Sequence, residues 1–130
     1  MATPKVLIIE DHPATAQFIS EVLTLEGFSS VIASDGRVGI EKTGEEKPDI
    51  ILLDVMLPGP NGFEVCKRLK EDPETSSIPV VIVSVRGSEG DRKKAFEAGC
   101  ADYIVKPFEI PDLIKAIRKH LTTEAQRKAP

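Results

Sequence analysis

Short hydrophobic runs recur along the chain, and a polar residue follows each of them directly. The four clearest runs, made of Val, Ile and Leu with one Tyr, are residues 6–9, 50–53, 80–83 and 103–105. The polar residues that follow are Glu10, Asp54, Ser84 and Lys106, in that order. Short runs rich in Val and Ile are typical of strands buried on both faces of a parallel sheet. In open sheets of this kind, ligands bind beyond the carboxyl ends of the strands, so these four side chains lie where chemistry is expected.

Segments with helical patterning alternate with the strands. A further strand is predicted at residues 29–33, and Gly27 ends the helix before it. The Pro and Gly residues of 57–62 predict a loop. The helical segments cover residues 18–26, 36–46, 63–70, 88–98 and 110–121. Five repeats of strand and helix with right-handed crossovers predict an α/β fold, a doubly wound parallel sheet between two helix layers. We expect the flavodoxin-like strand order 2-1-3-4-5.

Composition and charge narrow the function classes. The chain has 130 residues, a net charge of −4 and a pI near 5.2, which argues against a surface that binds nucleic acid. No apolar stretch approaches the roughly 18 residues that cross a bilayer. The first strand also begins too early for a signal peptide. We therefore expect one cytoplasmic domain that binds neither nucleic acid nor membrane.

The Cys and His residues do not indicate a metal site. Cys66 and Cys100 lack the spacing of metal ligands and are expected to be buried free thiols. His12 and His120 are not expected to be metal ligands either.

The predicted strand order brings the polar strand ends together. Neighbouring strands lie about 4.8 Å apart, so Glu10 and Asp11 should lie beside Asp54, followed by Ser84 and then Lys106. Three carboxylates in one place repel one another, which raises their pKa values or requires a cation. Oxygen ligands without His or Cys suit Mg²⁺. A phosphoryl group would then find a nucleophile in Asp54, a neutralising charge in Lys106 and a hydrogen-bond donor in Ser84.

This combination resembles the receiver domains of bacterial two-component response regulators. The resemblance extends from residue 5 to about residue 121. It implies that Asp54 is the phosphoacceptor and that Lys106 and Ser84 assist the transfer.

The resemblance also implies a metal site with Mg²⁺ as the cofactor. Its ligands would be Glu10, Asp11, Asp54 and the backbone carbonyl of Met56. The family further implies a cis peptide bond between Lys106 and Pro107, a geometry found in only about 5–6% of X–Pro bonds.

The family's switch and lifetime positions can be located in the same way. Ser84 is the switch hydroxyl and Tyr103 the switch aromatic, which we expect to rotate inward when Ser84 is drawn toward a phosphoryl group. Met56 and Arg86 stand two residues past the phosphoacceptor and the switch hydroxyl. Their long side chains should obstruct the water that hydrolyses the phosphoryl group.

The implied function is a phosphorylation-activated signalling switch and not a turnover enzyme. Residues 1–122 would form the receiver domain and 123–130 a polar C-terminal tail. The upstream partner would be a histidine kinase or a histidine phosphotransfer protein. A downstream effector protein would bind the face made by the fourth helix, fifth strand and fifth helix. We expect a monomer or a weak dimer.

Three alternatives differ from this interpretation. The winged-helix transcription factors of the family carry Asp and Arg where this chain has Ala101 and Ala116. This favours a stand-alone receiver, with the receiver half of a DNA-binding regulator as the alternative. A flavodoxin needs a hydroxyl-rich, Gly-containing phosphate loop after the first strand, where this chain is acidic. A phosphatase of the haloacid dehalogenase type needs a second acid where this chain has Pro13.

Overall fold

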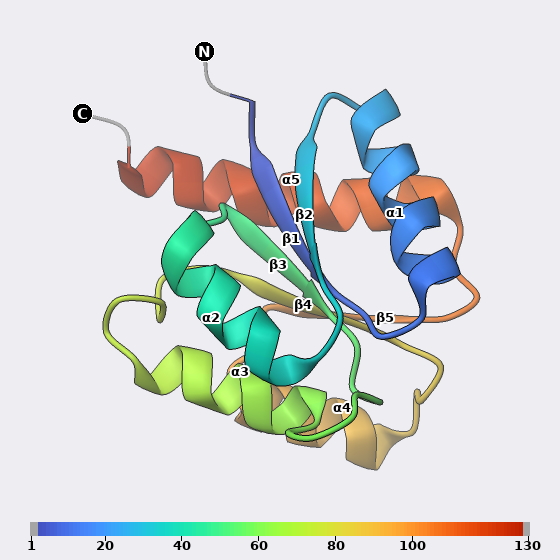
Figure 1. Cartoon of the computed structure of the whole chain (residues 1–130), viewed down its shortest axis with the longest axis vertical. Coiled ribbons are helices and arrows are strands. Elements are labelled where there is room, and N and C mark those ends of the chain that lie inside the picture. Colours follow the sequence, from blue (N-terminus) through green and yellow to red (C-terminus); the bar gives the residue numbers. More distant parts are fainter. Residues whose placement is uncertain (1–2, 129–130) are drawn as a thin grey trace.

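The computed structural model describes residues 3–128, with side-chain surroundings as far as residue 121. Strands and helices alternate five times in this part of the chain (Figure 1). The strands are β1 (Lys5–Ile9), β2 (Ser29–Ala33), β3 (Ile50–Leu53), β4 (Val80–Ser84) and β5 (Asp102–Val105). The helices are α1 (Pro13–Leu25), α2 (Gly36–Glu46), α3 (Gly62–Glu71), α4 (Glu89–Glu97) and α5 (Ile110–Lys128).

All the predicted elements are present, and the main difference concerns the end of α5. The sequence predicted a polar tail at 123–130, whereas the helical backbone continues through Lys128. Residues 129–130 of that tail lie outside the described residues. The boundary of the receiver domain at residue 122 stays a prediction.

The five strands form one parallel sheet in the order β2-β1-β3-β4-β5, which confirms the predicted order. The hydrogen-bond ladder continues one residue past the strands. The amide of Glu10 donates to Ala33 at 3.0 Å, and the amide of Asp54 donates to Ile9 at 3.1 Å. The amide of Lys106 donates to the carbonyl of Ser84 at 2.8 Å. These hydrogen bonds therefore fix the backbone of Glu10, Asp54 and Lys106 at one edge of the sheet.

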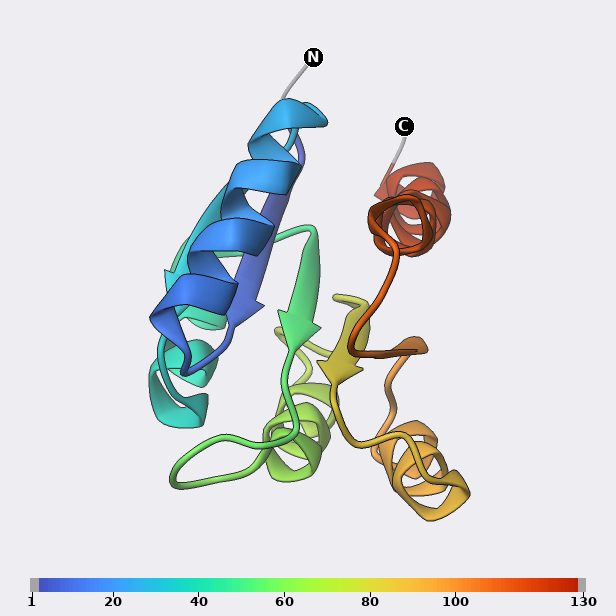
Figure 2. The ribbon, with the colours of Figure 1, turned by 90° about the vertical axis from the view of Figure 1, so that its right-hand side faces the viewer.

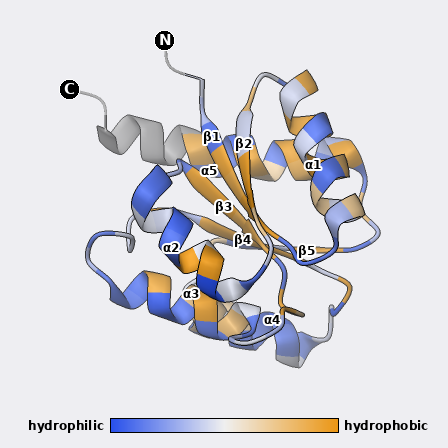
Figure 3. Cartoon of the chain, in the orientation of Figure 1, coloured by the Kyte–Doolittle hydropathy of each residue, from blue (hydrophilic) through white to orange (hydrophobic). Residues whose placement is uncertain are grey.

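Helices cover both faces of the sheet (Figures 1 and 2). Side chains of α1 and α5 pack with Val6 and Ile8 of β1, whereas side chains of α2, α3 and α4 pack with Leu7 and Ile9. Because successive strand residues point to opposite faces, the middle of this sheet needs hydrophobic residues that face both helix layers. Figure 3 shows the resulting hydrophobic strands between more polar helices. All four residues of β3 are at most 2% exposed.

Within residues 3–128, no helix has both the length and the hydropathy that a membrane span requires.

Candidate functional site

Three charged side chains meet at the carboxyl edge of the sheet. The Lys106 ammonium lies 2.6 Å from Glu10 Oε1 and 3.2 Å from Asp54 Oδ2. Both carboxylates are buried, with exposed fractions of 4% for Glu10 and 7% for Asp54. Burial alone would lower the pKa of Lys106, but its hydrogen bond to Glu10 and the charge of Asp54 outweigh that effect and raise the pKa. Lys106 is therefore a stable cation that partly neutralises both acids.

The loop after β3 orients the Asp54 carboxylate. The amide of Met56 donates to Asp54 Oδ1 at 3.0 Å, so each carboxylate oxygen accepts a hydrogen bond. After the loop, the backbone at Gly62 packs against the backbone of Asp54. A Cβ atom on residue 62 would lie 2.3 Å from the Asp54 carbonyl oxygen. Only glycine permits this close approach. Asn61 then caps α3 by accepting from the Glu64 amide at 3.1 Å.

Asp11 completes the acid cluster and makes it suitable for a cation. Its Oδ1 atom is buried and accepts no hydrogen bond from any residue between 3 and 121. A buried carboxylate oxygen that accepts no hydrogen bond is costly, and a bound cation would remove that cost. The oxygen donors of Glu10, Asp11 and Asp54 suit a hard divalent ion such as Mg²⁺. The residues present thus fit the metal that the sequence predicted.

His12 is the neighbour that sequence reasoning missed. Its Nδ1 atom lies 3.2 Å from Asp11 Oδ1 and 3.5 Å from Glu10 Oε2. With Glu10 and Asp11 it forms a group whose ligand atoms all lie within 4.8 Å of one another. The expectation of an acid cluster with no histidine nearby is therefore wrong. Its position directly after the acid pair in the sequence was the available signal.

The two predicted switch residues are connected through the backbone of Arg86. The buried Ser84 hydroxyl accepts from the Arg86 amide at 3.3 Å, and the Tyr103 hydroxyl donates to the Arg86 carbonyl. Tyr103 is only 5% exposed, and the Arg92 guanidinium lies 5.3 Å from the centre of its ring. The inward position that was expected only after phosphorylation is thus already adopted here, because the hydrogen bond to Arg86 holds the ring inside.

The Arg86 side chain forms an ion pair with α4. Its guanidinium lies 2.6 Å from Asp91 Oδ1, and the Ser88 hydroxyl donates to Asp91 Oδ2 at 2.8 Å. The hydrogen bond from Ser88 lowers the pKa of Asp91, burial opposes this effect, and Arg86 lowers the pKa further. Met56, the other predicted lifetime residue, is 53% exposed. The roles of Met56 and Arg86 in phosphoryl lifetime stay predictions.

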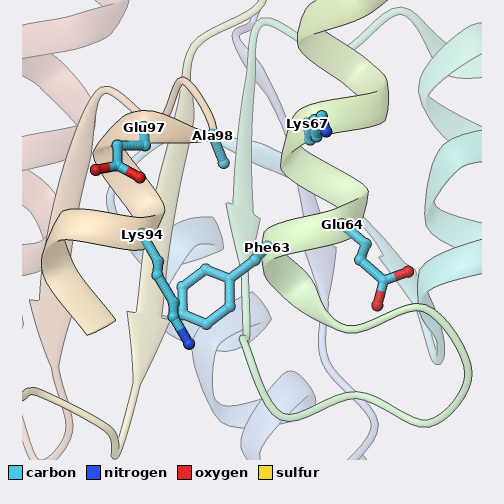
Figure 4. Close-up of a pocket in the computed structure, with 6 residues that line it drawn as sticks. All are labelled: Phe63, Glu64, Lys67, Lys94, Glu97 and Ala98. Carbon is cyan, nitrogen blue, oxygen red and sulfur yellow. The ribbon is translucent and has the colours of Figure 1, made fainter. Parts of the chain in front are cut away.

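A groove of about 370 Å³ lies between α3 and α4, away from the acid cluster (Figure 4). The Lys94 ammonium and the Arg86 guanidinium each lie 6.0 Å from the centre of the Phe63 ring. None of the predicted site residues lines this groove. Its lining residues are Phe63, Glu64, Lys67, Lys94, Glu97 and Ala98.

Two further expectations are confirmed. The Lys106–Pro107 peptide bond is cis. Cys66 and Cys100 are buried and form no disulfide.

Residues 6–118 match the family model of the response regulator receiver domain. The DNA-binding dual master transcriptional regulator RpaA of Synechocystis sp. is 37% identical over 115 residues, which are 88% of this chain and 48% of RpaA. The chain spans between a quarter and about half of the length of the curated relatives it matches.

Solved structures agree with this match. The BeF3-activated N-terminal receiver domain of Klebsiella pneumoniae RstA is 31% identical, with a TM-score of 0.84 and coverage of 90% of this chain and 97% of that one. The receiver domain of the sensor histidine kinase PA1611 from Pseudomonas aeruginosa PAO1 was solved with a magnesium ion in its active site cleft. It shares the fold at 24% identity, with a TM-score of 0.86 and coverage of 93% and 99%. This chain therefore belongs to the response regulator receiver domain family.

Proposed function

We propose that Asp54 accepts a phosphoryl group from a histidine kinase or a histidine phosphotransfer protein in a two-component relay. The observation that carries the proposal is the Lys106 ammonium, which contacts both Glu10 and Asp54 beside Asp11, whose Oδ1 atom accepts no hydrogen bond from the described residues. A buried carboxylate held by a cation and next to a cation-binding acid pair is arranged for reaction with a phosphoryl group.

In the proposed step, an Asp54 carboxylate oxygen attacks the phosphorus atom of a phosphohistidine. An O–P bond forms as the N–P bond breaks, and the electron pair stays on the imidazole, which takes up a proton. Lys106 transfers one hydrogen bond from Asp54 to a phosphoryl oxygen, and Ser84 donates to another. Mg²⁺, held by Glu10, Asp11, Asp54 and the carbonyl of Met56, would neutralise phosphoryl charge.

The protein acts in this scheme as a switch and not as a turnover enzyme. Its own Asp54 is modified and is later restored by hydrolysis. When Ser84 turns toward the phosphoryl group it gives up the Arg86 amide, and the change passes to Tyr103 and α4. A downstream protein would recognise the altered face of α4, β5 and α5.

The support for a stand-alone receiver lies on that same face. Ala101 and Ala116 stand where charged contacts between active dimers are expected in the DNA-binding subfamily, and Ala116 is only 9% exposed. The similarity to RpaA favours the other candidate, the receiver half of a DNA-binding regulator. Light scattering on the phosphorylated chain separates the two, because a monomer agrees with the stand-alone role and a tight dimer with the second.

The phosphoacceptor assignment is tested with a small phosphodonor. Acetyl phosphate and Mg²⁺ should raise the intact mass by one phosphoryl group, because the Asp54 carboxylate lies 3.2 Å from the Lys106 ammonium, which also contacts Glu10. Asp54→Asn should abolish the gain. The matched control is Asp112→Asn, an exposed carboxylate in the first turn of α5, which should be phosphorylated like the wild type. Undiminished incorporation in Asp54→Asn would overturn the assignment.

A further inference from the structure

The His12 imidazole is a chemical group at the acid cluster that the proposed phosphoryl transfer does not use. His12 is the N-cap residue of α1, yet its side chain makes no capping hydrogen bond. The side chain is 74% exposed, so an ion can reach it directly from solvent. At the same time its Nδ1 atom faces the carboxylates of Asp11 and Glu10. The helix therefore leaves the imidazole available to a ligand at this site.

The donor atoms around His12 are spaced like ligands of one ion. Two donors bonded to a transition metal at about 2.1 Å lie about 3.0 Å apart at right angles and about 3.4 Å apart at tetrahedral angles. The His12 Nδ1 atom lies 3.2 Å from Asp11 Oδ1 and 3.5 Å from Glu10 Oε2. Asp11 Oδ1 is moreover the buried oxygen that accepts no hydrogen bond from the described residues. Small adjustments would let all three atoms bind one ion.

We propose that His12 adds a nitrogen ligand to Glu10 and Asp11, so that this site binds an imidazole-preferring divalent transition metal such as Ni²⁺ or Zn²⁺ as well as Mg²⁺. The inference rests on the proposed function in that it uses the same acid cluster. Imidazole favours Ni²⁺ and Zn²⁺, whereas carboxylate, carbonyl and water favour Mg²⁺. A transition metal bound through His12 occupies Asp11 and Glu10, and it therefore competes with Mg²⁺.

The test is calorimetric titration of the untagged protein with NiCl2 and, separately, with MgCl2, in the absence of any phosphodonor. His12→Ala should weaken Ni²⁺ binding by at least about tenfold, because a ligand is lost. Its Mg²⁺ affinity should change by less than about twofold, because oxygen atoms hold that ion. Ni²⁺ is paramagnetic, so it should also broaden the amide signals of residues 10–12 in the wild type.

The matched control is His120→Ala. His120 is the other histidine of the chain, and its Nε2 atom also lies 3.2 Å from a carboxylate, that of Asp102. This variant should bind Ni²⁺ like the wild type. Equal Ni²⁺ affinity in His12→Ala and wild type, or a loss confined to His120→Ala, overturns the proposal. Since no phosphodonor is present, the result is independent of whether Asp54 is the phosphoacceptor.

Discussion

Arg86 connects the first turn of α4 with the switch hydroxyl, the first through its guanidinium and the second through its backbone amide. It forms a 2.6 Å ion pair with Asp91, while the Arg86 amide donates to Ser84. A phosphoryl group on Asp54 would offer this cation a second partner. The ion pair with Asp91 therefore competes with any shielding of the phosphoryl group, and the side chain can shield only in the fraction of molecules in which that pair opens.

We predict that Arg86→Glu loses its phosphoryl group several-fold faster than the wild type, a barrier lower by about 1 kcal/mol. An acidic side chain here would orient the attacking water, as Gln does in small GTPases. Arg86→Met is the control, because it removes the cation but provides no group that orients water. Decay of the phosphorylated forms is followed by intact mass with Mg²⁺ present. Equal or slower decay in Arg86→Glu would contradict the prediction.

Among the helices, α4 has the fewest buried residues. Its buried residues are only Asp91 and Ala95, and Phe96 is half exposed. Its other contacts are largely polar. The Ser88 hydroxyl caps the N-terminus of α4, and the cations of Arg86 and Lys94 lie near the Phe63 ring. A helix with so few apolar contacts can have two arrangements that differ by a few kcal/mol, which is what a switch requires.

We predict that Ser84→Ala is phosphorylated on Asp54 but loses most of the amide shift changes that phosphorylation causes in residues 86–97. The Ser84 hydroxyl is the only side-chain atom of the described residues that accepts from the Arg86 amide, so without it the signal to α4 is broken. Two-dimensional NMR with acetyl phosphate and Mg²⁺ measures the changes. Ser29→Ala, on the exposed start of β2, is the control and should respond like the wild type. The coupling is wrong if Ser84→Ala responds as fully as the control.

The elements were predictable because each depends on local residue order. A doubly buried sheet needs unbroken runs such as those of β1 and β3, and Gly27, with a φ of +89°, ends α1 as its position suggested. Contacts of polar side chains were less predictable. Arg86 could pair with any nearby acid, and only the start of α4 at Glu89 brings Asp91 within reach. His12 was not expected to be a metal ligand, although its position beside the acid pair decides its neighbours.

Across the whole molecule, the buried thiols make stability sensitive to alkaline pH. Burial raises the pKa of Cys66 from 9.0 to about 11 and that of Cys100 from 9.0 to about 12, and the neighbouring Cys66 adds to the rise in the pKa of Cys100. Burial also raises the pKa of Tyr103. In the unfolded chain the thiols ionise near their ordinary pKa, so above pH 9 the unfolded state binds fewer protons than the folded state. Folding stability must then fall as the pH rises.

We predict that the free energy of unfolding is nearly constant from pH 7 to pH 8.5 and falls by on the order of 1 kcal/mol or more by pH 10. The loss continues until the pH passes the folded-state pKa values of the thiols. Urea unfolding at each pH measures the effect under reducing conditions, which exclude disulfides between unfolded chains.

The double variant Cys66→Ala, Cys100→Ala is the control. It starts from a lower stability, because two buried side chains are truncated, but its stability should fall less steeply between pH 8.5 and pH 10. The pKa values of Tyr103 and Lys106 are also raised in the folded state. In the unfolded chain both groups lose their protons at a higher pH than the thiols, but at a lower pH than in the folded state, so they lower the stability in the same direction. Parallel pH profiles for the wild type and the double variant would show that the thiols are not the cause.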